Sequence, residues 1–287
     1  MADDVTVPQS DQQKSRIAGV FGRAASAYDQ VGPRFFAHFG LRLVELSQLH
    51  EGAAVLDVGC GRGASLFPVA DRIGPTGNAI GIDLAESMID EMTHDIRARG
   101  LANVKAQVMD AEDLRFPAET FDHVLCGFCL FFFPQRERAL AEMRRVLRPG
   151  GRLAISTWGK FDAQWEWFDE LLDSYLQDPE APSNEDDEKL AETETPAGML
   201  AVLGEAGFAD AQVVSESAWF TYGTHDEWWA TLWSHGVRID LERIEARLGS
   251  RGLAEFKAET RQRMGASMRS GGIRQEMSVL YTLGARP

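Results

Sequence analysis

Short apolar runs alternate with helix-spaced apolar positions through the middle of the chain. The runs have the length of buried strands and end at glycine, aspartate or similar polar stops. They cover Ala54–Val58, Ala79–Ile82, Val104–Met109, Phe121–Cys126 and Arg152–Thr157. The stretches between them carry helical spacing closed by glycine or proline. This alternation predicts a parallel sheet with helices on both faces.

The amino-terminal part has a different pattern. Residues Met1–Gln13 are polar and show no periodicity, so we expect them to be disordered. Helical spacing then runs from Ile17 to His50. We expect these residues to form a helical cap that precedes the first strand.

The carboxy-terminal part departs from the alternation. An aromatic-rich helix is predicted over Phe161–Leu176, and the acidic segment Asp178–Glu194 is typical of a solvated loop. A long helical stretch, Asp226–Met268, lies between two further strands, Ala211–Thr221 and Met277–Gly284. We expect the last strand to be antiparallel and at the edge of the sheet.

These elements predict an α/β fold built on a doubly wound, seven-stranded, mostly parallel sheet. We divide the chain into four parts. Residues 1–50 form the amino-terminal helical segment, and 51–158 form a Rossmann-like ligand-binding core. Residues 159–195 form a lid insertion with the acidic loop. Residues 196–287 complete the sheet and contain a helical insertion at 223–275.

The chain has 287 residues and a formal net charge of −15. Proteins that bind nucleic acid present basic surface to phosphate groups, so this charge argues against such a partner. No apolar run reaches about eighteen residues, the length of a membrane span. Residues Met1–Ser15 lack the basic and apolar regions of a signal peptide. We therefore expect a cytoplasmic protein that acts on a small molecule, and a homodimer is compatible with the composition.

Three cysteines, Cys60, Cys126 and Cys129, lie in apolar contexts. Three thiols cannot form a disulfide framework, which fits a reducing cytoplasm. We interpret them as small core residues rather than redox groups. We expect no metal site.

A glycine-rich turn follows the first strand directly. It reads Val55-Leu56-Asp57-Val58-Gly59-Cys60-Gly61-Arg62-Gly63. Such a turn lets a ligand lie against bare backbone, where a Cβ atom would collide. Alone it is ambiguous, because Gly59, Gly61 and Ala64 also satisfy a relaxed dinucleotide-binding fingerprint. A dehydrogenase of this size would usually show a second nucleotide-binding half, and none follows Trp158.

Further residues suited to a nucleoside end the next strands in turn. Asp83 ends the second strand, where a carboxylate can accept hydrogen bonds from ribose hydroxyls. Asp110 and Ala111 end the third, where the carboxylate can accept from an adenine amino group. Leu84 and Met88 offer apolar surface to the purine. Ligands in open α/β sheets bind at the carboxyl ends of the strands, so these positions predict one site.

With these motifs in order, the chain resembles the class I S-adenosylmethionine-dependent methyltransferases from about Phe21 to Trp158. It is most similar to the branch that holds the ubiquinone and menaquinone biosynthesis enzymes and many natural-product small-molecule methyltransferases. Besides the glycine run, the matching motifs are Gly81-Ile82-Asp83-Leu84, Asp110-Ala111-Glu112-Asp113-Leu114, Phe121-Asp122 and Arg145-Val146-Leu147-Arg148-Pro149-Gly150-Gly151. The resemblance implies the Rossmann-like methyltransferase fold.

The resemblance also implies S-adenosyl-L-methionine as cofactor. It implies that Gly59 and Gly61 contact the methionine portion, Asp83 the ribose, and Asp110 with Ala111 the adenine. Tyr28 is implied to close over the cofactor from the amino-terminal helix. We accordingly expect the cofactor to be bound by Tyr28, Asp57, Gly59, Cys60, Gly61, Asp83, Leu84, Met88, Asp110, Ala111 and Cys126.

Aromatic residues gather in the two insertions after the fifth and sixth strands, where the family builds its lid over the acceptor. Taken singly, such residues are more often core than pocket. As a group they favour an apolar or planar acceptor. We expect His235 to be the candidate general base. We expect the acceptor to be bound by Phe128, Trp158, Trp228, Trp229 and Trp233.

The expected function is methyl transfer from S-adenosylmethionine to oxygen, nitrogen or carbon of a small metabolite, in secondary metabolism or quinone-type biosynthesis. The alternative is a protein that binds the cofactor for a non-methylating role, such as ligand cyclisation or scaffolding, because a retained site does not prove turnover. Release of S-adenosylhomocysteine separates the two.

Overall fold

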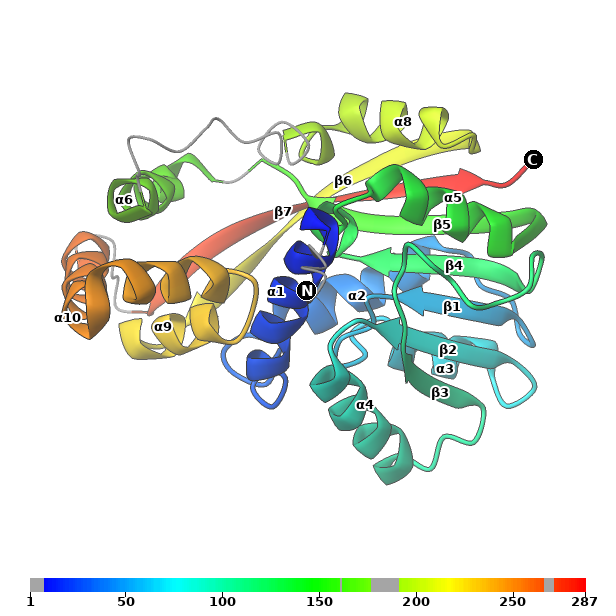
Figure 1. Ribbon diagram of the computed structural model, residues 1–287, viewed down its shortest axis with the longest axis horizontal. Coiled ribbons are helices and arrows are strands. Elements are labelled where there is room, and N and C mark those ends of the chain that lie inside the picture. Colours follow the sequence, from blue (N-terminus) through cyan, green and yellow to red (C-terminus); the bar gives the residue numbers. More distant parts are fainter. Residues whose placement is uncertain (1–7, 161, 177–190, 266–270) are drawn as a thin grey trace, which may run out of the picture.

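Seven strands form one mixed sheet, in the order β3-β2-β1-β4-β5-β7-β6 (Figure 1). The computed structural model describes residues 8–160, 162–176, 191–265 and 271–287. The strands are β1 (Ala54–Val58), β2 (Asn78–Asp83), β3 (Val104–Val108), β4 (Phe121–Gly127), β5 (Leu147–Trp158), β6 (Ala209–Tyr222) and β7 (Ile273–Ala285). β1 to β5 pair in parallel, and β7 runs antiparallel to both of its neighbours. The predicted seven-stranded α/β architecture is confirmed.

Helices cover both faces of this sheet. They are α1 (Gln9–Ala24), α2 (Phe35–Leu46), α3 (Leu66–Ile73), α4 (Glu86–Ala98), α5 (Arg136–Val146), α6 (Glu166–Leu176), α8 (Pro196–Glu205), α9 (His225–Trp233) and α10 (Arg238–Gly265). Apolar residues of α2, α3 and α4 pack on one face, and those of α5 and α8 on the other. In β1, Val55 belongs to the first of these cores, while Leu56 and Val58 belong to the second. Successive side chains of a strand point to opposite faces, which explains the unbroken apolar run.

The last strand lies inside the sheet, so the expectation that it forms the edge is wrong. β7 is paired with β5 from Arg152↔Ala285 to Trp158↔Val279, and with β6 on its other side. Its residues from Val279 to Leu283 are all buried, whereas β6 alternates between half-buried and exposed positions. A strand with neighbours on both sides and cover on both faces is apolar without alternation. The edge position belongs to β6.

The amino-terminal helix begins earlier than the apolar periodicity predicts. α1 starts at Gln9, so residues 9–13, which we expected to be disordered, form its first turns. These residues are polar on every side of the helix and therefore carry no apolar period. Lys14 and Ile17 attach the helix to the rest of the molecule through tertiary contacts, which a local pattern does not show. Residues 1–7 lie outside the described part of the chain.

The long helical stretch predicted near the carboxyl end is divided into two helices. α9 ends at Trp233 and α10 begins at Arg238, and α10 is kinked at Gly249, where φ is 68°. The expected end at Met268, and most of the acidic segment Asp178–Glu194, lie outside the described residues. Within the described ranges, no helix combines the length and the apolar character needed to cross a membrane.

β6 and β7 extend beyond the other strands toward α6, α9 and α10 (Figure 1). They have 14 and 13 residues, against 5 in β1. Tyr222, the last residue of β6, pairs with Ile273, the first residue of β7. The α9–α10 segment is therefore an insertion between two adjacent strands. α1 lies between this insertion and the sheet (Figure 1), and its Arg23 forms an ion pair with Glu242 of α10.

Candidate functional site

The glycine-rich turn after β1 borders a first cavity, here called the glycine-loop cavity. Gly59 and Gly61 have φ values of 65° and 48°, a region that side chains of L residues rarely allow. A Cβ atom on Gly59 would lie 2.5 Å from Sγ of Cys129, so packing behind the turn also requires glycine here. A Cβ atom on Gly61 would lie 3.5 Å from the ring of Tyr28. The bare backbone therefore faces the residue that we expect to close the site.

Asp83, the last residue of β2, is hydrogen-bonded to the same turn. Its Oδ2 accepts from the N–H of Gly61 at 3.0 Å, and its Oδ1 accepts from the N–H of Ala85 at 2.9 Å. Burial raises the pKa of the Asp83 carboxyl, while these N–H groups oppose the rise. Each carboxylate oxygen keeps a further lone pair, so Asp83 can also accept from hydroxyl groups of a ligand.

Asp57 lies behind the turn with an oxygen that has no partner. The side chain is buried, and no described residue bonds to its Oδ2. Burial, together with the nearby Asp83, raises the pKa of Asp57 to about 8. A cationic ligand would offset the repulsion between these two carboxyl groups, which the low dielectric of the interior strengthens.

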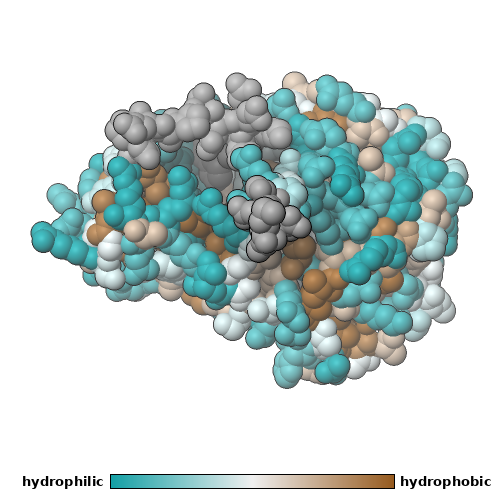
Figure 2. Space-filling model, viewed as in Figure 1, coloured by the Kyte–Doolittle hydropathy of each residue, from teal (hydrophilic) through white to brown (hydrophobic). Residues whose placement is uncertain are grey.

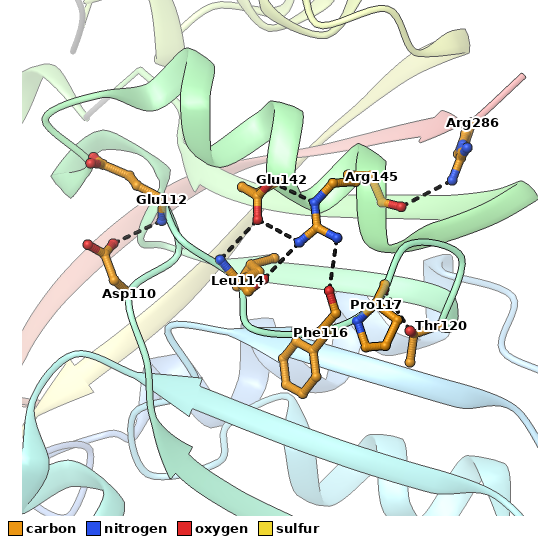
Figure 3. A network of polar contacts seen from close by, with 9 residues as sticks. All are labelled: Asp110, Glu112, Leu114, Phe116, Pro117, Thr120, Glu142, Arg145 and Arg286. Atoms are coloured by element: carbon orange, nitrogen blue, oxygen red, sulfur yellow. Dashed lines mark hydrogen bonds and ion pairs between the residues drawn. The ribbon is translucent and has the colours of Figure 1, made fainter.

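The loop after β3 is held by a network around Arg145 of α5 (Figure 3). Arg145 donates to the carbonyl oxygens of Leu114 and Phe116 at 2.7 and 2.8 Å. It also donates to Glu142 at 2.7 Å, and Glu142 accepts from the N–H of Leu114 at 3.0 Å. These bonds fix the course of the loop that begins at Asp110.

α1 borders the glycine-loop cavity from the side opposite the turn. Lys14, Ile17 and Phe21 line the cavity, and Nζ of Lys14 lies 2.8 Å from Oδ2 of Asp110. The cavity has a volume of about 90 Å³. Sites for small ligands measure about 300–1,000 Å³. The space between α1 and the turn is therefore smaller than a nucleoside, and the residues that line it must shift when one binds.

A second cavity of about 390 Å³, here called the aromatic cavity, adjoins the first. Four aromatic residues line both cavities: Phe21, Tyr28, Phe128 and Phe132. Further rings in the wall come from Phe35, Phe36, Trp158, Trp165, Phe168, Tyr222 and Trp228. The ring centroids of Phe128 and Trp158 lie 4.3 Å apart, and Tyr28 stacks on Phe36 at 5.1 Å. The shared rings form the boundary across which ligands in the two cavities would meet.

His235 lines the aromatic cavity from the turn between α9 and α10. Its ring meets Phe35 and Phe36 edge-on, with centroid distances of 5.5 and 6.1 Å. Its Nδ1 accepts from the N–H of Val237 at 3.5 Å. Burial lowers the pKa of His235 to about 4. The ring is therefore neutral at physiological pH.

Three carboxyl groups also line the aromatic cavity: Asp169 of α6, Glu194 and Asp240 of α10. Burial raises the pKa of each, and Asp169 further raises the pKa of Glu194. Asp240 accepts a hydrogen bond from Arg243 at 3.2 Å. The cavity is thus aromatic over most of its wall and acidic where α6 and α10 meet.

Comparison with known proteins finds one match to the ligand-binding core and others to most of the chain. A family model described as a methyltransferase domain matches residues 55–151. The YcgJ protein of Bacillus subtilis has the same fold, with a TM-score of 0.57 at 18% identity over 87% of this chain and 98% of that one. The aklanonic acid methyltransferase DauC of Streptomyces species (strain C5) is 42% identical over 149 residues, which are 52% of this chain and 68% of the relative. The nocamycin O-methyltransferase of Saccharothrix syringae is 32% identical over 240 residues, or 79% of this chain and 84% of the relative. This chain belongs to the S-adenosylmethionine-dependent methyltransferases.

The glycine-loop cavity of this methyltransferase fits S-adenosylmethionine by charge and by hydrogen bonding. The cofactor carries a sulfonium and an ammonium group, and the two buried carboxyl groups of Asp57 and Asp83 supply opposite charge. Asp57 does not line the cavity, but its buried carboxyl, with the unpartnered Oδ2, lies behind the turn and favours positive charge in the ligand. The remaining lone pairs of Asp83 suit ribose hydroxyls.

The structure brings most of the expected cofactor residues of the methyltransferase together. The side or main chains that line the glycine-loop cavity include Tyr28, Gly59, Gly61, Asp83, Leu84, Met88, Asp110 and Ala111. The other three expected cofactor residues, Asp57, Cys60 and Cys126, do not line it. Cys126 lies behind the turn, with its Sγ 3.2 Å from that of Cys129.

The expected acceptor residues divide between the aromatic cavity and the helix interface beside it. Phe128, Trp158 and Trp228 line the cavity. Trp229 instead packs against Phe256 of α10, and Trp233 lies under the guanidinium of Arg238. Neither borders the cavity.

Sequence reasoning expected the amino-terminal segment over the cofactor, but it missed Lys14 and Phe21 of α1 and the three acidic residues in the aromatic cavity. Lys14 belongs to a polar segment without apolar periodicity, so no local pattern marked it. Phe21 belongs to the helix-spaced apolar positions, but nothing in the sequence showed whether its ring lines a pocket or packs in the core. Glu194 belongs to the acidic segment predicted to be a solvated loop, and nothing in the sequence distinguished Asp169 or Asp240 from other helical carboxylates.

Proposed function

We propose that this methyltransferase transfers the methyl group of S-adenosylmethionine to an oxygen, nitrogen or carbon atom of a planar, largely apolar metabolite. The observation that carries the proposal is the boundary shared by the two cavities. A cofactor in the glycine-loop cavity and a flat acceptor in the aromatic cavity would meet at Phe21, Tyr28, Phe128 and Phe132. Two relatives named for aklanonic acid and nocamycin support a natural-product acceptor.

Each part of the chain has a proposed task. Residues 51–158 bind the cofactor, with Gly59 and Gly61 on its methionine portion, Asp83 on the ribose, and Asp110 with Ala111 on the adenine. The described part of the amino-terminal segment, from residue 8 to residue 50, covers it through α1 and Tyr28. The insertions at 159–195 and 223–275 shape the acceptor site.

The bound cofactor supplies an activated methyl group on a sulfonium. The protein's part is to hold the acceptor atom in line with that group, and such positioning can contribute about 7–11 kcal/mol to the lowering of the barrier. Stacked rings such as Phe128 and Trp158 restrict a flat acceptor to one plane and exclude water. No covalent nucleophile is required of the chain.

A small acceptor suits the surface better than a polyanion. The chain carries a formal net charge of −15. The face drawn in Figure 2 is mostly hydrophilic, with apolar residues in small separate areas. Strong negative charge disfavours approach of a phosphate backbone. A cytoplasmic location remains part of this proposal.

Calorimetric titration with S-adenosylmethionine tests the cofactor site directly. We expect binding by the wild type, none with NADH, and weaker binding by Asp83→Asn, which keeps the side-chain shape. Loss of a charge-assisted hydrogen bond costs about 1.5–3 kcal/mol, or roughly ten- to a hundredfold in affinity. Circular dichroism verifies that the variant is folded. Failure of folded wild type to bind the cofactor would overturn the proposal.

The acceptor class is then screened by release of S-adenosylhomocysteine with flat phenolic, quinonoid and amine-bearing compounds. We expect turnover with planar compounds and none with flexible aliphatic alcohols. Turnover confined to peptides or nucleic acids would contradict the proposed acceptor class.

A further inference from the structure

The turn between α9 and α10 brings a histidine into the aromatic cavity, and the next residue of the turn packs at the boundary between the two cavities. Gly236 belongs to this turn, and a Cβ atom on it would lie 3.4 Å from Cζ of Phe132 and 3.9 Å from Cζ of Phe21. Both phenylalanines line both cavities. The neighbouring His235 lines the aromatic cavity and is packed edge-on against Phe35 and Phe36. His235 therefore lies in the proposed acceptor cavity, one residue before the glycine that packs against the rings shared by both cavities.

The hydrogen bond to the backbone decides which nitrogen of His235 carries the proton. Nδ1 accepts from the N–H of Val237, so in the neutral ring Nδ1 has no proton and Nε2 has one. The turn that supplies this N–H is closed by two more backbone bonds, from Arg238 N–H to His235 O at 2.9 Å and from Ile239 N–H to Gly236 O at 3.0 Å. The donor of Val237 is thereby held in place.

A ring in this state donates a hydrogen bond and does not take up a proton. Nε2 already carries hydrogen, and protonation at Nδ1 would break the bond to Val237. The rings in contact with His235, Phe35 and Phe36, carry no charge, and burial disfavours the imidazolium. The carboxyl groups of Asp169, Glu194 and Asp240 line the same cavity, but burial raises the pKa of each. Burial is the cause of the lowered pKa of His235. A histidine that acts as general base is usually oriented by an acceptor at its second nitrogen; here the second nitrogen faces a donor.

We propose that His235 binds the acceptor by donating a hydrogen bond from Nε2, and that the acceptor is an enol or phenol with an ionised oxygen or an adjacent carbonyl oxygen to receive it. This rests on the proposed methyl transfer and specifies its acceptor. The hydroxyl proton leaves to water before the transfer. The ionised oxygen then forms the new bond to the methyl carbon, while the carbon–sulfur bond breaks and its electron pair remains on sulfur. A donor at Nε2 favours the ionised oxygen and fixes the plane of the acceptor.

Nitrogen-15 NMR of histidine-labelled protein tests the proposal without any acceptor. We expect the long-range correlation spectrum of His235, assigned by its disappearance in His235→Gln, to show the proton on Nε2 and a bare Nδ1, unchanged across the physiological pH range. A proton on Nδ1, an average of both tautomers, or an imidazolium at neutral pH would overturn it. In Val237→Pro, which lacks the N–H, we expect the two tautomers to mix. If Val237→Pro folds and His235 keeps its proton on Nε2, the hydrogen bond from Val237 does not determine the tautomer, and that part of the proposal is overturned. If Val237→Pro does not fold, the wild-type spectrum decides.

Turnover separates donation from base catalysis. The amide nitrogen of glutamine reaches the position of Nε2 and donates, but glutamine is not a base. With the planar compound that gives most S-adenosylhomocysteine in the screen, we expect His235→Gln to keep most of the turnover and His235→Ala to lose much of it. General-base catalysis contributes about 10²–10⁴-fold, so a loss of that size in both variants would overturn the proposal. Cofactor titration should be unchanged in both, and it separates this outcome from failure of the cofactor site.

Discussion

Lys14 of α1 lies with its Nζ 2.8 Å from Oδ2 of Asp110, which follows two residues after the end of β3. The same ammonium group forms an ion pair with Glu112, whose side chain is 1% exposed. One residue of the amino-terminal helix thus neutralises two carboxylates beside the proposed adenine position. Since Arg23 links the other end of α1 to Glu242, the helix is attached to both the core and the insertion.

Replacement of Lys14 by methionine should destabilise the protein. The change leaves Glu112 buried and without its cation, and removing one partner of a partly buried pair costs about 1–3 kcal/mol. Urea denaturation should show a lower midpoint. The double variant Lys14→Met/Glu112→Gln should recover part of the loss, because the amide removes the uncompensated charge. Equal midpoints for wild type and Lys14→Met would mean that the ion pair contributes nothing.

Cofactor binding should tighten as pH rises toward about 8. In the free protein, burial and Asp83 raise the pKa of Asp57 to about 8, so Asp57 is protonated below that pH. A bound ammonium group favours the carboxylate and lowers this pKa, so binding releases a proton and is favoured by higher pH until the free protein is itself ionised. Calorimetry in buffers of different ionisation enthalpy measures the release. Asp57→Asn should abolish the dependence; a wild-type affinity independent of pH would contradict it.

Arg145→Ala should weaken cofactor binding several-fold and lower stability by about 1–3 kcal/mol, because two carbonyl oxygens and Glu142 lose their donor. The loosened loop carries Asp110. Arg144→Ala is a matched control, since within the described part of the chain Arg144 donates only to the carbonyl of Gly207, at 3.0 Å, in an exposed position. Cofactor titration and thermal unfolding measure both effects. Equal behaviour of the two variants would refute a role of the Arg145 network in shaping the site.

Trp158→Ala should raise the KM for a planar acceptor while cofactor affinity stays the same. Trp158 lines the aromatic cavity only, and its contact with Phe128 at 4.3 Å has a typical value of about 0.5–1.5 kcal/mol. We therefore expect KM to rise by roughly two- to tenfold. Trp219→Ala on edge strand β6 is the control, because that ring is 49% exposed and lines neither cavity. A parallel loss of cofactor affinity in Trp158→Ala would show that the ring serves the core instead.

The sequence predicted the parallel half of the sheet, because each buried strand is a short apolar run. It also predicted the polar residues that follow these runs. Buried strands such as Ala54–Val58 are apolar throughout, and Asp83 and Asp110 follow from strand ends alone. The order of β6 and β7 was not determined in this way. The run from Val279 to Leu283, apolar or aromatic except at Thr282, contrasts with the alternation along most of β6, and this contrast could have revealed the order.

The sequence predicted that the acceptor site is aromatic, but it did not predict which aromatic residues line it. Trp228, Trp229 and Trp233 belong to one short helix, and only Trp228 borders the aromatic cavity. Which side of α9 faces the cavity depends on its packing against α10, where Trp229 meets Phe256. That packing joins residues far apart in the sequence, so the pattern of residues within α9 does not predict it.

The pairing of Tyr222 with Ile273 has a consequence for how this enzyme could diversify. The two residues hold the entry and exit of the α9–α10 insertion side by side, so its ends fit together whatever lies between them. The segment can lengthen, shorten or be exchanged for that of a relative while the register of β6 and β7 stays intact, provided that its contact with α1 through Glu242 is kept. Selection for a new acceptor can therefore act on this one insertion. Residues 223–272 are accordingly the natural unit to exchange between enzymes of this family.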